Sequence, residues 1–188
     1  MTKRAYLRAE DRRQQLLEAV GRLFDRAGFG GITMAGAATE AGVSRQLVYD
    51  HFDDLGTLCD AFVEARLARY RADLPDISSL RPDEASATMF RHLLTIPSTD
   101  RRVVRLLVAD VGLAALDGLR ERFCADELAR WPNSQRSGPR AAAAMWATSS
   151  ALLALADAVT SGEITEREAT TMAVGIVRST AAPHDVEA

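Results

Sequence analysis

The sequence has few of the residues that build metal sites, disulfides and catalytic centres. It contains two cysteines and three histidines, none at a spacing typical of metal ligands. Cys59 and Cys124 form no CxxC pair, so they are interpreted as buried structural thiols; a redox sensor would need an accessible, low-pKa thiolate. Glycine-rich phosphate loops, a Ser/His/Asp order and paired carboxylates are also missing. The sequence therefore predicts no enzyme, no cofactor and no metal.

Long apolar runs are missing as well. No stretch of about eighteen apolar residues occurs, and the N-terminus is charged rather than built like a signal peptide. We therefore expect a cytoplasmic protein with no membrane span. A hydrophobic content of 47% with 26% charged residues is ordinary for a globular chain with a sizeable core.

Lysine is nearly absent, and the charge is unevenly divided. Residues 1–52 carry eight Lys or Arg against six Asp or Glu, whereas residues 53–188 carry fifteen against twenty. The overall charge of −3 thus combines a positively charged part, residues 1–52, with a negatively charged part, residues 53–188. This division suits DNA binding by the first part. The excess is small, so charge alone does not identify the partner.

The most informative stretch runs from Thr33 to Phe52. Thr33 and Ser44 can each accept hydrogen bonds from free N–H groups at a helix start. Gly42, between them, can adopt the left-handed conformation that ends a helix in a tight turn. The spacing predicts a short helix, a three-residue turn and a second short helix, which is a helix-turn-helix whose second helix enters the DNA major groove.

The residues of this stretch separate into a packing face and an outer face. The packing face comprises Ala38, Ala41, Val43, Val48 and Phe52. On the outer face, Arg45 can grip guanine and Gln46 can pair with adenine. Tyr49, His51 and the N–H groups at the helix starts can bind phosphate. The predicted DNA-binding residues are Thr33, Ser44, Arg45, Gln46, Tyr49 and His51.

Helical periodicity and breaks outline the remaining chain. A first helix is expected over 10–27, closed by Gly28. Further helices are expected over 55–72, 82–95, 103–116, 119–131, 141–160 and 165–179, with breaks at 74–79, 96–99 and 132–140. Asp110, inside an apolar helix, is interpreted either as a rim carboxylate bonded to arginine or as a ligand-gripping group.

The motif Ala-Gly-Val-Ser-Arg-x-x-Val-Tyr-x-His-Phe at 41–52, after an amphipathic helix and Gly-Phe-Gly-Gly-Ile-Thr, resembles the tetracycline-repressor (TetR) family. The similarity is detailed over about residues 10–60 and general beyond them. It implies an all-α fold with a three-helix DNA-binding domain in 1–54, a helical ligand-binding and dimerisation domain in 55–180, and a loose tail in 181–188.

The same resemblance implies a function. It indicates a repressor that binds double-stranded DNA at a palindromic operator as a homodimer, with recognition helices about 34–36 Å apart, and that a small-molecule effector releases. The helices 141–160 and 165–179 would form the dimer interface; an intramolecular hairpin is the alternative. Residues on the helices that enclose a cavity in relatives are Phe62, Arg66, Met89, His92, Phe123 and Trp146.

Several positions depart from the family pattern. Leu55 stands where relatives commonly have a phosphate-binding lysine, and Asp53 and Asp54 precede it. Gly36 lies inside a helix, at a cost of about 1 kcal/mol relative to alanine. Asp50, on the recognition helix, either reads a cytosine amino group or repels DNA. These departures keep a second hypothesis open, a helical ligand- or partner-binding protein with a degenerate DNA-binding head.

Overall fold

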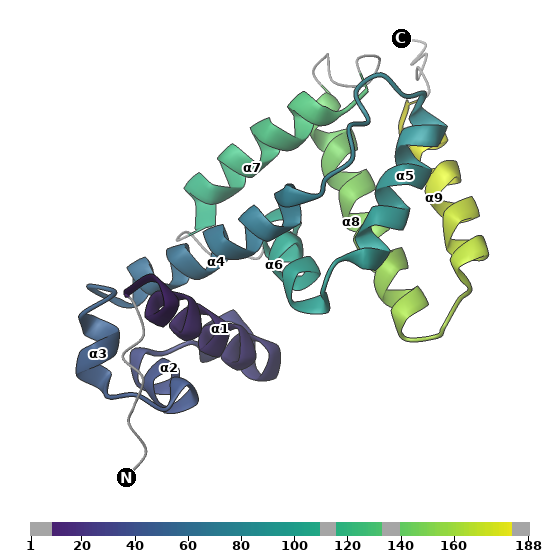
Figure 1. Ribbon diagram of the computed structural model, residues 1–188. Helices are drawn as coiled ribbons and strands as arrows, with labels where there is room; N and C mark the ends of the chain where they lie inside the picture. The colour runs from purple at the N-terminus through teal and green to yellow at the C-terminus, as the bar shows by residue number, and fades with distance from the viewer. Residues whose placement is uncertain (1–8, 110–115, 133–139, 182–188) are drawn as a thin grey trace. The chain divides into compact units, whose positions relative to one another are not determined.

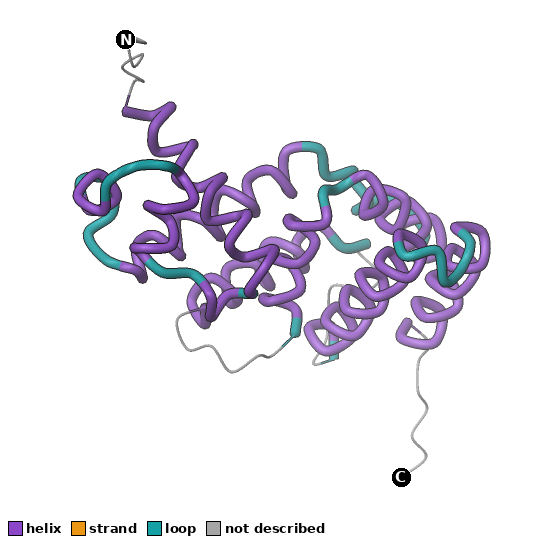
Figure 2. The backbone as a smooth tube through the Cα atoms, turned by 90° about the horizontal axis from the view of Figure 1, so that it is seen from below, coloured by secondary structure: helices purple, strands orange, loops and turns teal. Residues whose placement is uncertain are grey.

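The computed structural model describes residues 9–109, 116–132 and 140–181 (Figure 1). The chain divides into two compact units, Met1–Arg69 and Tyr70–Ala188. Every regular element in the described ranges is a helix (Figure 2), which confirms the predicted all-α class. The expectations for Asp110 and for residues 182–188 of the predicted tail, and most of the predicted loop 132–140, fall outside the described residues; Ala181, the first residue of that tail, is helical.

The first unit contains a three-helix head and most of the following helix. Its elements are α1 (Ala9–Ala27), the short 3-10 helix η1 (Phe29–Gly31), α2 (Met34–Ala41), α3 (Arg45–Tyr49) and the greater part of α4 (Leu55–Ala72). The Gly28 N–H donates to the Phe24 carbonyl at 2.9 Å and ends α1 where the sequence predicted. The apolar stripe of α1 is buried, with Leu16, Val20 and Phe24 at most 2% exposed.

Most of α4 belongs to the first unit, and its side chains there pack on α1. The Phe62 ring lies 5.5 Å from the Phe24 ring. Arg66 lies over Phe62 at 5.3 Å, and its Nη2 donates to the Leu17 carbonyl at 3.4 Å. The unit consequently extends to Arg69, well past the predicted boundary after residue 54.

The second unit is a helical bundle around α8. Its helices are α5 (Pro82–Thr95), α6 (Ser98–Val108), α7 (Asp117–Arg130), α8 (Ala141–Thr160) and α9 (Glu166–Ala181). Helix α8 packs against all four of the others, and α5 packs against α9 (Figure 1). The predicted bounds of α5 and α8 are confirmed. Thr165 and Glu168 form a reciprocal cap at the start of α9, each N–H donating to the other side chain at 2.9 and 3.3 Å.

The prediction for α6 was wrong at both ends. It begins at Ser98 rather than at 103, and it ends at Val108 with Ala109 extended. Asp100 lies in its first turn, where a negative charge favours the free N–H groups. At the other end, Nε of Arg120 donates to the Leu107 carbonyl at 3.0 Å and so satisfies an acceptor that the last turn leaves free.

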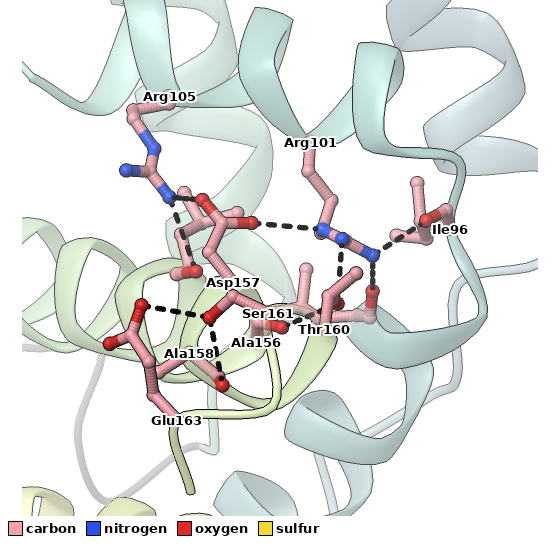
Figure 3. A network of polar contacts seen from close by, with 11 residues as sticks. Ile96, Arg101, Arg105, Ala156, Asp157, Ala158, Thr160, Ser161 and Glu163 are labelled. Carbon is pink, nitrogen blue, oxygen red and sulfur yellow. Dashed lines mark hydrogen bonds and ion pairs between the residues drawn. The ribbon is translucent and has the colours of Figure 1, made fainter.

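Arg101 joins three segments of this unit (Figure 3). Its side chain is 4% exposed and its Nη1 donates to the carbonyls of Leu93 at 3.2 Å and Ile96 at 2.8 Å. Its Nη2 donates to the Thr160 hydroxyl at 3.0 Å, and its Nε to Asp157 Oδ1 at 3.3 Å. One side chain of α6 thus ties the end of α5 to the end of α8.

Helix α8 is long and apolar enough to cross a membrane when judged by length and composition alone. Its 20 residues have a mean hydropathy of 1.4 in the most apolar window, of which 33% is buried inside this chain. A central helix of a bundle has the same composition, and α8 occupies that position here.

Candidate nucleic-acid interface and ligand cavity

The helix-turn-helix is built by the caps that the sequence predicted. Thr33 Oγ1 accepts from the Gly36 N–H at 2.9 Å at the start of α2. Gly42 has φ +67°, a left-handed conformation that costs little only in glycine, and it ends α2. Ser44 Oγ then accepts from the Leu47 N–H at 3.2 Å and begins α3. Short-range hydrogen bonds therefore set both helix starts.

The predicted recognition face of α3 points outward. Val48 is fully buried, and it fixes the inner side of the five-residue helix. Arg45, Gln46 and Tyr49 are exposed, Tyr49 by 49%. His51 is half-buried after the helix. The exposed side chains are free of the core and available to a groove.

Asp50 bonds to one of these side chains. Nε2 of Gln46 donates to Asp50 Oδ1 at 2.9 Å. A bidentate contact to adenine requires both the amide nitrogen and the amide oxygen of glutamine. Asp50 therefore competes with the base for Gln46, a role that neither sequence interpretation of Asp50 included.

Two arginines of α1 are engaged by α2. Nε of Arg22 lies 2.7 Å from Glu40 Oε1, and Arg26 bonds the other carboxylate oxygen. These hydrogen bonds, from Arg26 first and then Arg22, lower the pKa of Glu40 to about 2. Part of the basic charge in the head is consequently matched by a carboxylate and attracts phosphate less than the residue count suggests.

Asp54, one of the two aspartates before α4, stabilises the start of that helix. Asp54 Oδ1 accepts from the Thr57 N–H at 2.7 Å and caps α4. The hydrogen bonds from Thr57, its backbone N–H first, lower the pKa of Asp54. Leu55, the first residue of α4, is 40% exposed, so its side chain contributes little to the core.

The second unit contains a cavity with a volume of about 40 Å³. This is room for a few waters, since one water needs roughly 10–15 Å³ on this scale. Its wall is mostly apolar and comes from α5, α7 and α8 together with Tyr70 of α4, Val104 of α6 and Val177 of α9. A larger ligand would have to displace side chains.

The six residues predicted to bind a ligand do not gather in one place. Met89 and Phe123 line the cavity. Trp146 stacks on Phe123 at 6.4 Å, and the His92 ring lies 6.5 Å from the Tyr70 ring. Both Trp146 and His92 are thus adjacent to lining residues. Phe62 and Arg66 lie in the first unit, packed on α1.

Glu127 is a carboxylate of the cavity wall that the sequence interpretation missed. It is 5% exposed, and its Oε1 has no hydrogen-bond partner among the described residues. The Tyr70 hydroxyl donates to the other oxygen, Oε2, at a long 3.4 Å. Burial raises the pKa of Glu127 to about 7, although Arg130 and Arg71 oppose the shift. The available signal was its position four residues after Phe123, on the buried face of α7.

Cys59 matches the interpretation as a buried structural thiol, whereas Cys124 is only half-buried. Cys59 is buried, and this burial raises the pKa of its thiol to about 11. Burial also raises the pKa of Cys124. Both thiols are protonated at neutral pH, and the thiol is the unreactive form. Within the described ranges, no group of three or more His, Cys, Asp or Glu residues could hold a metal ion.

The first unit has the capped helix-turn-helix arrangement whose second helix enters the major groove in DNA-binding proteins. Residues 16–58 match the family model described as bacterial regulatory proteins, tetR family. The matched segment contains the helix-turn-helix, so this part of the chain is similar to the DNA-binding domain of that family. No curated protein matches the sequence.

Solved structures of TetR-type regulators share the fold at low sequence identity. A TetR-like regulator from a Rhodococcus species is 20% identical, with a TM-score of 0.66 over 92% of this chain and 97% of that one. MexZ, a repressor responsible for antibiotic resistance in Pseudomonas aeruginosa, is 20% identical, with a TM-score of 0.58 over 92% and 94%. SmeT in complex with triclosan is 19% identical, with a TM-score of 0.56 over 90% of each chain.

Proposed function

We propose that this protein is a cytoplasmic repressor that binds a palindromic operator as a homodimer and leaves it when a small molecule occupies the cavity. The observation that carries the proposal is the recognition helix α3. Its cap at Ser44 fixes the helix, Val48 anchors it, and Arg45 and Gln46 face outward. Arginine and glutamine are the side chains that read guanine and adenine by paired hydrogen bonds.

The surface of α8 and α9 supports a second copy of the chain as the partner. Exposed small residues follow one face of α8 at intervals of four, three and four residues: Ala143, Ala147, Ser150 and Ala154. On α9, Met172 is 51% exposed. Small side chains allow helices to approach closely, and a twofold axis would place the same face of each copy against the other. The four helices would then bury apolar surface that one copy leaves in water.

Helix α4 supports the coupling between ligand and DNA. It carries Phe62 and Arg66 in the core of the first unit and Tyr70 in the wall of the cavity. A ligand that displaces Tyr70 therefore acts on the helix that holds α1. Coupling of this kind requires unequal ligand affinity for the two states and is typically about 1–3 kcal/mol. The repressor role of MexZ and the triclosan complex of SmeT agree with this proposal.

A second candidate is a ligand-binding protein whose head binds DNA weakly. It is favoured by the Gln46–Asp50 hydrogen bond and by the pairing of Arg22 and Arg26 with Glu40. Both remove groups from DNA recognition. A loss of DNA affinity would leave the cavity unaffected, so the two candidates differ in DNA binding alone.

A footprinting experiment separates the two. The full chain is titrated onto the DNA that flanks its own coding region, at about 50 mM and about 200 mM salt. We expect two protected half-sites whose centres lie about 10 base pairs apart, or a multiple of that spacing. Arg45→Ala should abolish the protection, whereas Arg91→Ala, an exposed arginine of α5, should preserve it. No protection at either salt concentration would overturn the repressor and favour the second candidate.

Assembly is measured separately, by light scattering during gel filtration. A dimer is expected for the unmodified chain. Ala147→Glu would place a charge in the middle of the exposed row on α8, and it should shift the chain to a monomer because an unpaired buried charge is costly. Glu163→Gln, in the exposed turn before α9, is the control. A monomer for the unmodified chain would contradict the proposed interface.

A further inference from the structure

The cavity wall holds a single charged side chain among the residues that line it. Apolar side chains cover most of the surface, and Ser86, Thr148 and Ser149 add hydroxyl groups. Of the described residues that line the cavity, Glu127 alone can carry a charge near neutral pH. The wall therefore has the polarity of a site for an apolar molecule with one polar or positively charged end.

Glu127 has unused bonding capacity at this wall. It is 5% exposed, and Oε1 has no hydrogen-bond partner in the described part of the chain. The single bond to Oε2, from the Tyr70 hydroxyl, is 3.4 Å long. An ionised carboxylate can accept about four hydrogen bonds, and a buried acceptor without a partner is costly. A donor placed in the cavity would satisfy the free oxygen.

Among the residues that the structure describes, no basic side chain of the cavity wall pairs with Glu127. Arg71 pairs with Asp126 at 2.9 Å rather than with Glu127. Arg130 acts on Glu127 only as a nearby positive charge. Neither arginine lines the cavity. The described part of the cavity wall therefore places no basic side chain beside Glu127.

Aromatic rings surround the same space. The Tyr70 and Phe123 rings lie 6.1 Å apart, and both line the cavity with Trp131. Ring faces attract cations through their quadrupoles, and they also provide apolar area. An ammonium group beside Glu127 would therefore lie near a carboxylate and near aromatic faces at once.

We propose that the effector is a compact apolar amine whose ammonium group binds Glu127 and whose hydrocarbon part lies between Phe123, Met89 and Leu152. The proposal rests on the proposed effector role of the cavity and adds the chemical class of the ligand. The small volume of the cavity favours a molecule of one ring over an extended one. Glu127 is the specificity-determining residue, because it alone distinguishes the amine from a neutral molecule of the same shape.

The test uses two probes of equal shape and different charge, benzylamine and benzyl alcohol. Each is titrated by calorimetry into the full-length unmodified chain and into two variants. Glu127→Gln preserves the shape of the side chain and removes its charge. Glu121→Gln changes an exposed carboxylate of the same helix and is the matched control. We expect benzylamine to bind the unmodified chain and the Glu121→Gln variant alike, and Glu127→Gln to weaken it by about tenfold or more. Benzyl alcohol should bind more weakly than benzylamine and should be indifferent to both variants.

The pH dependence provides a second measurement. Because burial raises the pKa of Glu127 to about 7, the affinity for benzylamine should increase between about pH 6 and pH 8 and stay level for benzyl alcohol. His92 beside Tyr70, together with Asp126, Arg71 and Arg130, remains in the Glu127→Gln variant. The increase should vanish in this variant, and an increase that survives would overturn the assignment to Glu127.

The binding results with the two probes test the chemical class of the ligand and leave the proposed repressor role untouched. Benzyl alcohol binding as tightly as benzylamine, or benzylamine binding that Glu127→Gln leaves intact, would overturn the amine class while the effector cavity stands. Binding of neither probe would overturn the amine class as well. Operator footprinting is independent of all these results, because Arg45 lies in the first unit and Glu127 in the second.

Discussion

Arg101 on α6 and Asp157 on α8 form an ion pair in which the guanidinium is buried and the carboxylate is half exposed. Nε lies 3.3 Å from Oδ1, with side-chain exposures of 4% and 42%. Arg105 also bonds this carboxylate (Figure 3). The pair therefore differs from an exposed surface ion pair, whose contribution is small. Arg101 stabilises the unit mainly through its buried guanidinium, which also donates to two backbone carbonyls.

Arg101→Met should consequently destabilise the second unit strongly. The change preserves an apolar stem and leaves the carbonyls of Leu93 and Ile96 without their donor. We expect a loss of about 3 kcal/mol in the free energy of unfolding, measured by urea denaturation. Arg91→Ala, on the exposed face of α5, should change it by less than about 0.5 kcal/mol. A loss below about 1 kcal/mol for Arg101→Met would show that water replaces the guanidinium.

Glu40→Gln should remove a pH-dependent part of the stability of the head. The pKa of Glu40 is lowered from 4.5 to about 2 by Arg26 and Arg22. A lowered pKa stabilises the folded chain above the ordinary value, and this stabilisation is lost as the pH falls from about 4.5 toward 2. Unfolding midpoints of the unmodified chain should exceed those of Glu40→Gln above pH 5, and the two should converge near pH 2. A difference that is constant with pH would contradict the ion pair.

Gly36→Ala should fail to stabilise α2 despite the higher helix propensity of alanine. A Cβ at this position would lie 2.9 Å from Thr33 Oγ1 and 3.2 Å from Leu23 Cδ1. The Thr33 oxygen accepts from the Gly36 N–H, so moving it weakens the cap. The propensity gain and the cap are each about 1 kcal/mol, so we expect no net gain in unfolding free energy.

Gly118→Ala is the control for Gly36→Ala, because it makes the same substitution at another helical glycine. Its Cβ would meet only Arg122 Nη1, at an ordinary 3.8 Å. A gain of about 0.4–1 kcal/mol is expected there from the reduced entropy of the unfolded chain. A comparable gain for Gly36→Ala, measured by the same denaturation, would show that the cap and Leu23 adapt without cost.

Leu55→Lys should strengthen DNA binding and increase its salt dependence. Leu55 is 40% exposed at the start of α4, so the change removes little buried surface. One new phosphate contact should steepen the plot of log affinity against log salt by about 0.9. Filter binding at four or five salt concentrations measures the slope, with Leu55→Gln as the uncharged control. An unchanged slope would place residue 55 out of reach of the phosphates.

The sequence predicted most helix ends from neighbouring residues. Thr33 and Ser44 each cap a helix as expected, because the oxygen and the N–H that it accepts from lie within three residues of each other. Ser98 shows where this reasoning failed. The segment 96–99 contains a proline and is typical of a break, yet it contains the first two residues of α6. Proline is compatible with the position just before a helix as well as with a loop.

The exposed residues of α3 could be predicted from the sequence, whereas the residues that line the cavity could not. Gln46 and Val48 lie two residues apart on one short helix, so helical periodicity alone places them on different faces. Phe62 and Arg66 were predicted to bind the ligand. They share α4 with Tyr70, which lines the cavity, yet they pack on α1. Helical periodicity identifies a buried face but does not say which partner covers it.

The amino-acid sequence by itself determined the helix-turn-helix, its caps and the outward position of the recognition residues, since these depend on contacts within a few residues. The cavity, the burial of Glu127 beside Tyr70 and the fourfold use of Arg101 were decided only by the tertiary structure. Tyr70 and Glu127 lie 57 positions apart in the chain. A carboxylate becomes a buried, partly unpaired acceptor only when helices distant in sequence exclude water from around it.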